Sequence, residues 1–158
     1  MGKIVISTNA SLDGVVQDPD GSEGLPFGGW FPRTGGTDLE EWGKIMFDDA
    51  LDTDALLLGR RTDAWFAERW LPRTGEWADR LNGLPKYVVS STLDAPRWGK
   101  GAVLSGDVAA AVAKLKREVD GNIVIFGSYP LARTLIDHDL VPDVGEVITD
   151  RPRIDEAQ

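Results

Sequence analysis

The chain has 158 residues, 42% hydrophobic and 27% charged, a composition typical of one globular domain. Its net charge of -9 disfavours broad electrostatic binding to nucleic acid. It has no cysteine and one histidine, which excludes a disulfide framework, a thiolate metal centre and a multi-histidine metal site. No apolar run approaches the roughly 18 to 20 residues of a membrane span, and the first residues are too short a run for a signal peptide. We therefore expect a cytoplasmic protein with one domain over 1–158, a loose polar tail at 151–158, and neither membrane nor nucleic acid as partner.

Short apolar runs predict the strands of a sheet. The four clearest cover residues 4–6, 55–58, 87–89 and 123–126, and a weaker run covers 102–104. None of them shows clear alternation with polar residues. Continuous apolar runs of this length are typical of strands buried on both faces, so we expect a mainly parallel sheet.

Helical patterns fall between these runs, over residues 39–47, 62–70, 107–119 and 131–140. Asp107 is a suitable N-cap for the third of these helices. The side chains expected to face the core are Val108, Val112, Leu115, Val119, Leu131, Leu135 and Ile136, with Trp42 and Trp65 on the earlier helices. Strands alternating with helices at this spacing predict an α/β fold.

The longest irregular segment is expected over residues 18–37, which hold nine glycines or prolines. A connection this long inside a compact domain is usually functional or mobile. It carries Phe27, Trp30 and Phe31. These aromatic side chains either close over a flat ligand or fold back as a small satellite core, and the sequence does not choose between the two.

Three predicted strands end in residues suited to bind an anion. The junctions read Gly59-Arg60-Arg61-Thr62, Ser90-Ser91-Thr92 and Gly127-Ser128-Tyr129-Pro130. Glycine allows a tight turn, a following helix N-terminus carries positive potential, and arginine adds forked donors. Each junction alone is weak evidence, because a turn or a helix cap explains the same residues. Because the carboxyl ends of parallel strands share one edge of a sheet, the three together predict a nucleotide with more than one phosphate.

The commonest nucleotide-binding motifs are missing from the sequence. The first strand continues as Ser7-Thr8-Asn9-Ala10-Ser11-Leu12-Asp13-Gly14, without the G-x-G-x-x-G of a dinucleotide fold. The chain also lacks G-x-x-x-x-G-K-[ST], which argues against a P-loop NTPase.

Four motifs in order carry a family resemblance. They are Ser11-Leu12-Asp13-Gly14, Leu57-Leu58-Gly59-Arg60-Arg61-Thr62, Lys86-Tyr87-Val88-Val89-Ser90-Ser91-Thr92-Leu93, and Ile123-Val124-Ile125-Phe126-Gly127-Ser128 with Leu131 and Leu135. Together they resemble the dihydrofolate-reductase-like superfamily, and more closely its RibD C-terminal (riboflavin-biosynthesis reductase-like) branch. The likeness covers residues 1–141. It implies an NADPH-dependent reductase with a mainly parallel central sheet flanked by helices in three layers, often a homodimer.

The resemblance also implies roles for individual positions, which are expectations here. Gly59, Arg60, Arg61 and Thr62 would hold the pyrophosphate and 2′-phosphate side of NADPH, and Ser90 and Ser91 would lie beside the adenosine phosphate. Gly127, Ser128 and Tyr129, with Leu131 in the same turn, would wrap the pyrophosphate and nicotinamide ribose. Asn9 and Ala10 would face the nicotinamide, and the segment from Asp18 resembles a mobile loop that covers the active site. The charge of a 2′-phosphate independently suits the two arginines.

The sequence departs from the family at two places. Dihydrofolate reductases proper use a carboxylate on the first helix, for which Asp13 and Asp38 are the candidates; Asp13-Gly14 is equally read as a turn, and Asp38 as a helix N-cap. After residue 141 the family runs through further strands, whereas this chain ends at Gln158, so its closing strands are expected to be atypical or shortened.

These observations predict a reductase that passes a hydride from NADPH to a small flat heterocycle, pterin-like or pyrimidine-like, or to a related C=N or C=O group. Asp13 is preferred over Asp38 as the proton source, with an ordered water as a third option. The alternative is a non-catalytic nucleotide-binding or interaction module that has lost its substrate pocket.

Overall fold

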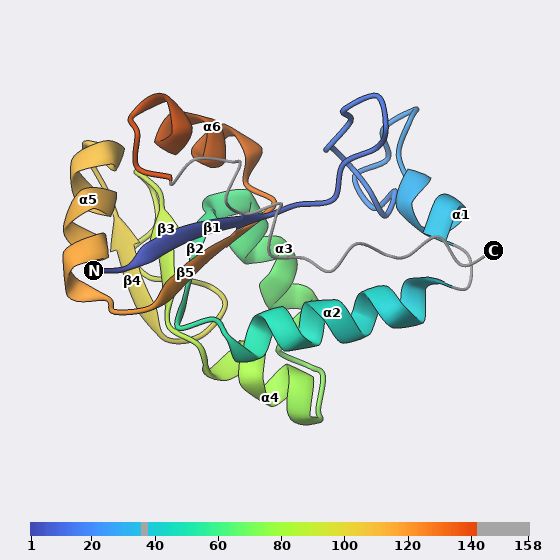
Figure 1. Cartoon of the computed structure of the whole chain (residues 1–158), viewed down its shortest axis with the longest axis horizontal. Coiled ribbons are helices and arrows are strands. Elements are labelled where there is room, and N and C mark those ends of the chain that lie inside the picture. The colour runs from blue at the N-terminus through green and yellow to red at the C-terminus, as the bar shows by residue number, and fades with distance from the viewer. Residues whose placement is uncertain (36–37, 142–158) are drawn as a thin grey trace.

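The computed structural model describes residues 1–35 and 38–141, and side chains except those of residues 34 and 35. Its centre is a five-stranded, all-parallel sheet with the strand order β1-β5-β2-β3-β4 (Figure 1). The strands are β1 (Lys3–Ser7), β2 (Ala55–Gly59), β3 (Lys86–Val89), β4 (Gly101–Leu104) and β5 (Asn122–Phe126). All five predicted strands are thus confirmed. The expected closing strands and the 151–158 tail lie outside the described residues.

The strands differ in how deeply they are buried. Four residues of β2, from Ala55 to Leu58, are fully buried, and β2 lies between β5 and β3. β4 is the least buried strand and pairs only with β3 among the described residues. Three of the four strands with clear apolar runs, β5, β2 and β3, therefore occupy the middle of the sheet, as expected for a parallel sheet covered on both faces, whereas β1 lies at one end of the strand order.

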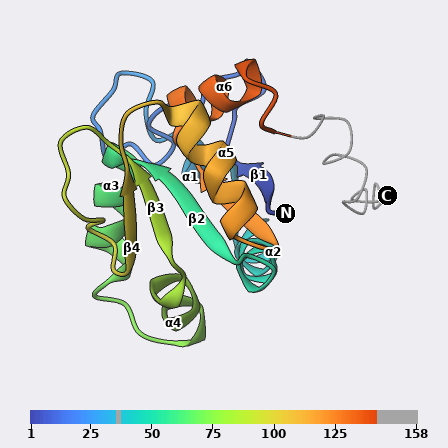
Figure 2. The ribbon, with the colours of Figure 1, turned by 90° about the vertical axis from the view of Figure 1, so that its left-hand side faces the viewer.

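The described part of the chain has six helices, and five of them cover the sheet. The six helices are α1 (Trp30–Gly35), α2 (Leu39–Leu51), α3 (Arg60–Trp70), α4 (Glu76–Gly83), α5 (Val108–Glu118) and α6 (Tyr129–Asp137). α5 and α6 lie on one face of the sheet and α2, α3 and α4 on the other (Figure 2), and their buried side chains belong to two separate core clusters. The result is the predicted α/β architecture with helices in separate layers. No helix among the described residues is long and apolar enough to cross a membrane.

The structure confirms the four predicted helices and corrects several details in the part of the chain that it describes. Asp107 caps α5 by accepting a hydrogen bond from the amide of Ala110, as its position predicts. The prediction that Ile136 faces the core is wrong, because it is 42% exposed. The buried residues of α6 are Leu131, Ala132 and Leu135. Ile136 follows Leu135 and is rotated by about 100° around the helix axis, which turns its side chain away from the core. The sequence patterns also missed α1 and α4, which are short.

The segment expected to be irregular over 18–37 contains α1. Phe31 on this helix packs edge-on against Trp42 of α2, with ring centroids 5.0 Å apart, and Trp30 packs against Phe31. Trp30 and Phe31 therefore form a small satellite core, which is one of the two alternatives that the sequence left open. Phe27 is exposed. Trp42 and Trp65 are only partly buried and lie outside the two core clusters, so placing them in the core was wrong.

The tryptophan of the core is Trp98, which precedes β4 and stacks on Phe66 of α3 at 5.0 Å. Two buried charged groups surround it. The Asp63 carboxylate accepts hydrogen bonds from the amides of Arg97 (2.8 Å) and Trp98 (3.1 Å). The Lys86 ammonium donates to the carbonyls at the end of α4 and lies 4.6 Å from the Trp98 ring. These contacts fix the β3–β4 connection against α3.

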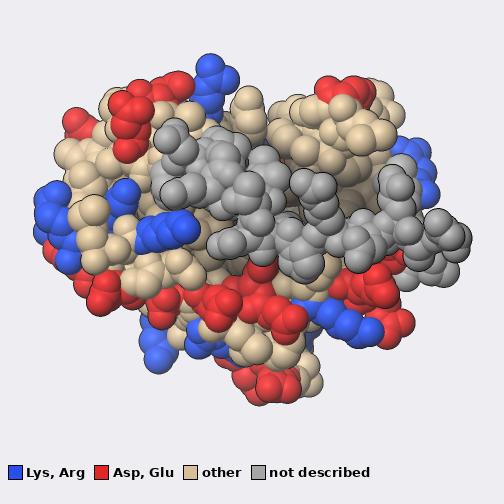
Figure 3. Space-filling view, in the orientation of Figure 1, with Lys and Arg blue, Asp and Glu red and all other residues tan. Residues whose placement is uncertain are grey.

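Acidic side chains dominate the outer surface in the view of Figure 3, with a band along the lower side where α2 lies. Lys and Arg side chains are scattered between them on this face rather than gathered into one patch. The distribution agrees with the net charge of -9. Any anion site on this protein therefore has to be local.

Candidate functional site

The predicted anion-binding junctions follow strands that are neighbours in the sheet. β5, β2 and β3 lie side by side and run parallel, so their carboxyl ends share one edge. α3 begins directly after β2, and two residues, Gly127 and Ser128, separate β5 from α6. The fold thus places two helix N-termini next to each other, at the position where open α/β sheets bind ligands.

A hydrogen bond joins these two helix starts. The Ser128 hydroxyl accepts from the amide of Gly59, at 3.0 Å, across 69 positions of sequence. Ser128 is the N-cap residue of α6, yet its side chain does not cap that helix. The first-turn amides of a helix have no partners within the helix, so this arrangement leaves those of α6 directed at the shared edge.

The backbone at this edge has an uncommon conformation. Gly127 and Ser128 both have positive φ, 54° and 48°, so the chain is left-handed at two successive residues. Glycine adopts this conformation freely, whereas serine does so at a cost of about 1 kcal/mol. The Gly127 amide donates to the carbonyl of Ser7 (3.2 Å), which ties the turn to the end of β1. Strain of this kind is concentrated at functional sites.

A cavity of about 410 Å³ opens beside this turn. Its walls come from the end of β1, from the segment that follows it and from α6. The lining residues are Ile6, Thr8, Val16, Gly127, Tyr129, Ala132, Arg133, Ile136 and Asp137. The volume lies in the range of small-molecule sites, and an apolar wall with a few polar groups is their usual lining. The exposure of Ile136 has its explanation here, because its side chain borders this cavity.

The two arginines at the start of α3 differ in their surroundings. Both are exposed, and the guanidinium of Arg61 forms an ion pair with Glu23 at 3.2 Å. Thr62, the next residue, lies behind the Gly127 turn, where a Cβ at position 127 would be 4.0 Å from its methyl group. The predicted set from 59 to 62 is therefore gathered at one helix start, but Arg61 faces the loop that follows β1.

The serines after β3 make a turn. The Ser90 hydroxyl accepts hydrogen bonds from the amides of Thr92 (3.1 Å) and Leu93 (3.2 Å), and Ser91 is exposed. The sequence allowed either a turn or an anion site at this junction, and these hydrogen bonds form the turn. A role beside the adenosine phosphate remains a prediction for Ser90 and Ser91.

The other proposed cofactor contacts lie around the same edge. Asn9 is partly buried and Ala10 exposed in the segment after β1, and Tyr129 is 53% exposed at the start of α6. The Leu131 side chain belongs to the core, so its contribution to the edge is the backbone of the first turn of α6.

The candidate carboxylates for proton delivery lie apart from the cavity lining. Asp13 is exposed in a turn where its carboxylate accepts from the Ser11 hydroxyl and the amide of Gly14 donates to the Ser11 carbonyl. Asp38 precedes α2 as its N-cap residue, and no side-chain cap hydrogen bond forms there. Asp13 thus lies in a turn and Asp38 at a helix start, as their alternative interpretations predicted. The catalytic roles of both residues remain predictions.

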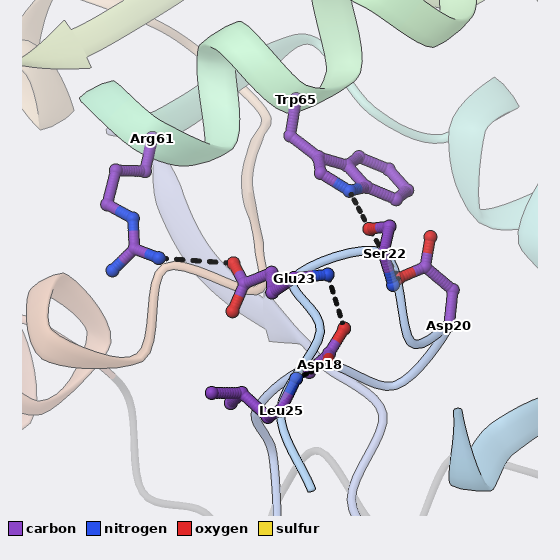
Figure 4. A network of polar contacts seen from close by, with 7 residues as sticks. All are labelled: Asp18, Asp20, Ser22, Glu23, Leu25, Arg61 and Trp65. Atoms are coloured by element: carbon purple, nitrogen blue, oxygen red, sulfur yellow. Dashed lines mark hydrogen bonds and ion pairs between the residues drawn. The ribbon is translucent and has the colours of Figure 1, made fainter. Parts of the chain in front are cut away.

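The loop before α1 packs on the outer side of α3 through polar contacts (Figure 4). The Trp65 indole donates to the Ser22 hydroxyl at 3.1 Å, the Arg69 guanidinium lies 3.6 Å from the Asp20 carboxylate, and Arg61 pairs with Glu23. Positions 61, 65 and 69 lie on one side of a helix because they are four residues apart.

The loop itself is organised by Asp18, which sequence reasoning missed. Its carboxylate is buried, 3% exposed, and accepts from the amides of Glu23 and Leu25, both at 2.9 Å. Its carbonyl accepts from Gly21 and Gly29. An aspartate in a glycine-rich segment is typical of a turn. That pattern indicates a local role for Asp18, but it does not indicate that the carboxylate is buried. Val16 of the cavity and Glu23 were missed as well, because no motif marks them.

Comparison with known families now adds to this geometry. A model of the RibD C-terminal domain matches residues 2–148. A comparison with curated proteins finds no significant match. Among the described residues, no cluster of three or more His, Asp or Glu side chains is arranged to hold a metal ion. The match covers nearly the whole chain, and the parallel sheet agrees with it, so this protein belongs to the RibD C-terminal domain family and is a riboflavin-biosynthesis reductase-like domain.

Proposed function

We propose that this domain binds NADPH and reduces a small flat heterocycle, or a related C=N or C=O group. The observation that carries the proposal is the hydrogen bond between Ser128 and Gly59. It joins two helix N-termini at the carboxyl edge of the sheet, beside a cavity large enough for an aromatic ring. Family membership supports the same reaction class.

The residues at this edge fit the phosphates of a dinucleotide. α3 has 11 residues and α6 has 9, and each presents the positive end of its dipole. The first turn of α6 offers the amides of Tyr129 and Leu131, because Pro130 between them has no N–H. An ideal Cβ at Gly59 would lie 3.6 Å from the Ser128 hydroxyl, on the side where the helix starts meet. Without that Cβ, a phosphate can approach the backbone closely, as it does in other nucleotide sites.

The cavity fits a flat ring. Ile6 and Val16 contribute apolar walls, Thr8 offers a hydroxyl, and Tyr129 stands at the start of α6 beside Gly127. When bound, the nicotinamide cofactor supplies the hydride from C4 of its ring. The protein's part is to hold the ring against the end of β1 and to exclude water from it.

The remaining assignments extend this proposal. Arg60 and Arg61 are the cations available near the start of α3 for a 2′-phosphate. The proton comes from Asp13, which we prefer over Asp38, or from an ordered water. The pH profiles of turnover of the Asp13→Asn and Asp38→Asn variants distinguish these sources. The homodimer expected from the family is tested by the molar mass of the protein in solution.

Titration with NADPH, read by tryptophan quenching and energy transfer, tests the site. We expect micromolar binding, tighter than for NADH and weakened about tenfold by Gly59→Ala or Arg60→Ala. Gly83→Ala is the matched control, because a Cβ at that position meets nothing within 4 Å. No binding at millimolar NADPH would overturn the proposal. Binding without oxidation across a panel of pterins and aminopyrimidines would favour the non-catalytic module instead.

A further inference from the structure

The loop places a carboxylate at the start of α3, where a cofactor phosphate is proposed to bind. The Oε1 atom of Glu23 lies 3.2 Å from Nη2 of Arg61. The Arg61 side chain is 78% exposed and that of Glu23 is 40% exposed, so both groups are accessible to a ligand (Figure 4).

The position of Glu23 is set by buried contacts rather than by the ion pair. The Glu23 amide donates to the buried Asp18 carboxylate at 2.9 Å, and the amide of Leu25 donates to the other oxygen of the same group. The neighbouring Ser22 hydroxyl accepts from the Trp65 indole on α3. The backbone that carries Glu23 is thus held on both sides, and its side chain reaches Arg61 from a defined place.

A carboxylate held there affects two related ligands in opposite ways. A 2′-phosphate carries about two negative charges, so a nearby carboxylate repels it and competes with it for the guanidinium. A 2′-hydroxyl is a hydrogen-bond donor, which a carboxylate accepts, and acidic residues select NAD in other dinucleotide folds in this way. Arg61 still has other N–H donors to offer, because Glu23 uses one nitrogen of its five-donor fork.

We propose that Glu23 is a specificity-determining residue that reduces the preference of this domain for NADPH over NADH. The inference rests on the proposed function, because it assumes that the ribose end of the cofactor lies at Arg61. Glu23 and Arg61 act as opposed selectors at that end: the cation favours the 2′-phosphate and the carboxylate favours the 2′-hydroxyl.

The chain provides a matched control for this proposal. Asp20 lies on the same loop and pairs with Arg69 of the same helix at 3.6 Å. Asp20→Asn and Glu23→Gln each remove one negative charge and convert one ion pair between the loop and α3 into, at most, a neutral hydrogen bond. Arg69 is eight residues further along α3 than Arg61, which is about 12 Å along the helix axis. Only the Glu23 substitution therefore changes the charge at the proposed 2′-phosphate position.

The experiment measures the dissociation constants of NADPH and NADH for five proteins by tryptophan quenching: the wild type, Glu23→Gln, Asp20→Asn, Arg61→Gln and the double variant Glu23→Gln/Arg61→Gln. We expect Glu23→Gln to raise the preference for NADPH about three- to tenfold, and Asp20→Asn to leave it within about twofold. The gain should shrink at 1 M salt, where the Debye length is about 3 Å. In an Arg61→Gln background, Glu23→Gln should raise the preference by less than it does in the wild type, because only the direct repulsion of the 2′-phosphate is then removed, as expected for coupled residues.

The results separate this inference from the proposed function. Wild-type protein that binds neither nucleotide overturns both. Wild-type protein that binds both nucleotides, with an unchanged ratio in Glu23→Gln, overturns the role of Glu23 alone. An equal change in Asp20→Asn also overturns it, because net charge or release of the loop would then explain the effect.

Discussion

Two buried aspartates in this protein make the same kind of contact with different consequences for the fold. Asp63, fully buried in the first turn of α3, accepts from two amides that are 34 and 35 residues away. Asp18, 3% exposed, accepts from two amides only five and seven residues away. The first carboxylate joins two parts of the core, whereas the second closes a loop on itself.

The difference shows how the two sides of the candidate site are built. The sheet side consists of strand ends, helix starts and the bond between Ser128 and Gly59, all continuous with the core. The loop side is attached to α3 by exposed pairs such as Glu23 with Arg61, and exposed pairs contribute about 0 to 1 kcal/mol each. We therefore expect the sheet side to unfold only with the whole domain and the loop side to open separately.

The largest effect is expected for Asp63→Ala. The substitution leaves the buried amides of Arg97 and Trp98 without their acceptor, and it removes the attraction that favours the charged form of Lys86. We expect the free energy of unfolding to fall by about 3 kcal/mol in urea denaturation. Glu68→Ala, at an exposed position of the same helix, should change it by less than about 0.5 kcal/mol. A loss below 1 kcal/mol for Asp63→Ala would contradict the comparison.

An effect of intermediate size is expected from the pH dependence of the sheet side. Burial lowers the pKa of Lys86 from 10.5 to about 8, against an opposing attraction from Asp63. Between these two pH values the unfolded chain binds more protons than the folded one, so the contribution of Lys86 to stability rises with pH. The destabilisation that comes from burying a charged Lys86 is fully present below pH 8 and is lost above pH 10.5.

Urea denaturation at pH 7 and pH 10 measures this contribution as the difference between the wild type and Lys86→Met. We expect the difference to move in favour of the wild type by roughly 2 kcal/mol at the higher pH. The exposed Lys114 provides the control, because Lys114→Met should show little change of this kind. A difference that is flat or falls with pH would mean that Lys86 is not titrating in this window.

The smallest effect on global stability is expected for Asp18→Ala. The amides of Glu23 and Leu25 can meet water when the loop opens, so we expect the free energy of unfolding to change by less than about 1 kcal/mol. Protease cleavage within residues 18–29 should increase severalfold, while cleavage near β2 should not. Gln17→Ala is the control, since its backbone carbonyl, not its side chain, accepts from Trp30. A loss of 2 kcal/mol or more would show that the loop is part of the cooperative core.

The sequence by itself determined the sheet and the edge at which the candidate site lies. Continuous apolar runs such as residues 55–58 can be buried only between two helical layers, and glycine with a helix start at 59 and 127 predicted where the chain turns. These signals are local, and neighbouring residues along the chain decide them. The helices α1 and α4 were not predicted from the sequence, because short helices show little periodic pattern.

Only the tertiary structure decided how distant residues combine at that edge. No pattern in the sequence indicates that Ser128 bonds to Gly59, that Val16 lines a cavity with α6, or that Glu23 pairs with Arg61. Each of these contacts depends on the strand order β1-β5-β2, which brings the first and last described strands together. The physical reason is that backbone propensities act over a few residues, whereas a binding site is set by the packing of segments far apart in the chain.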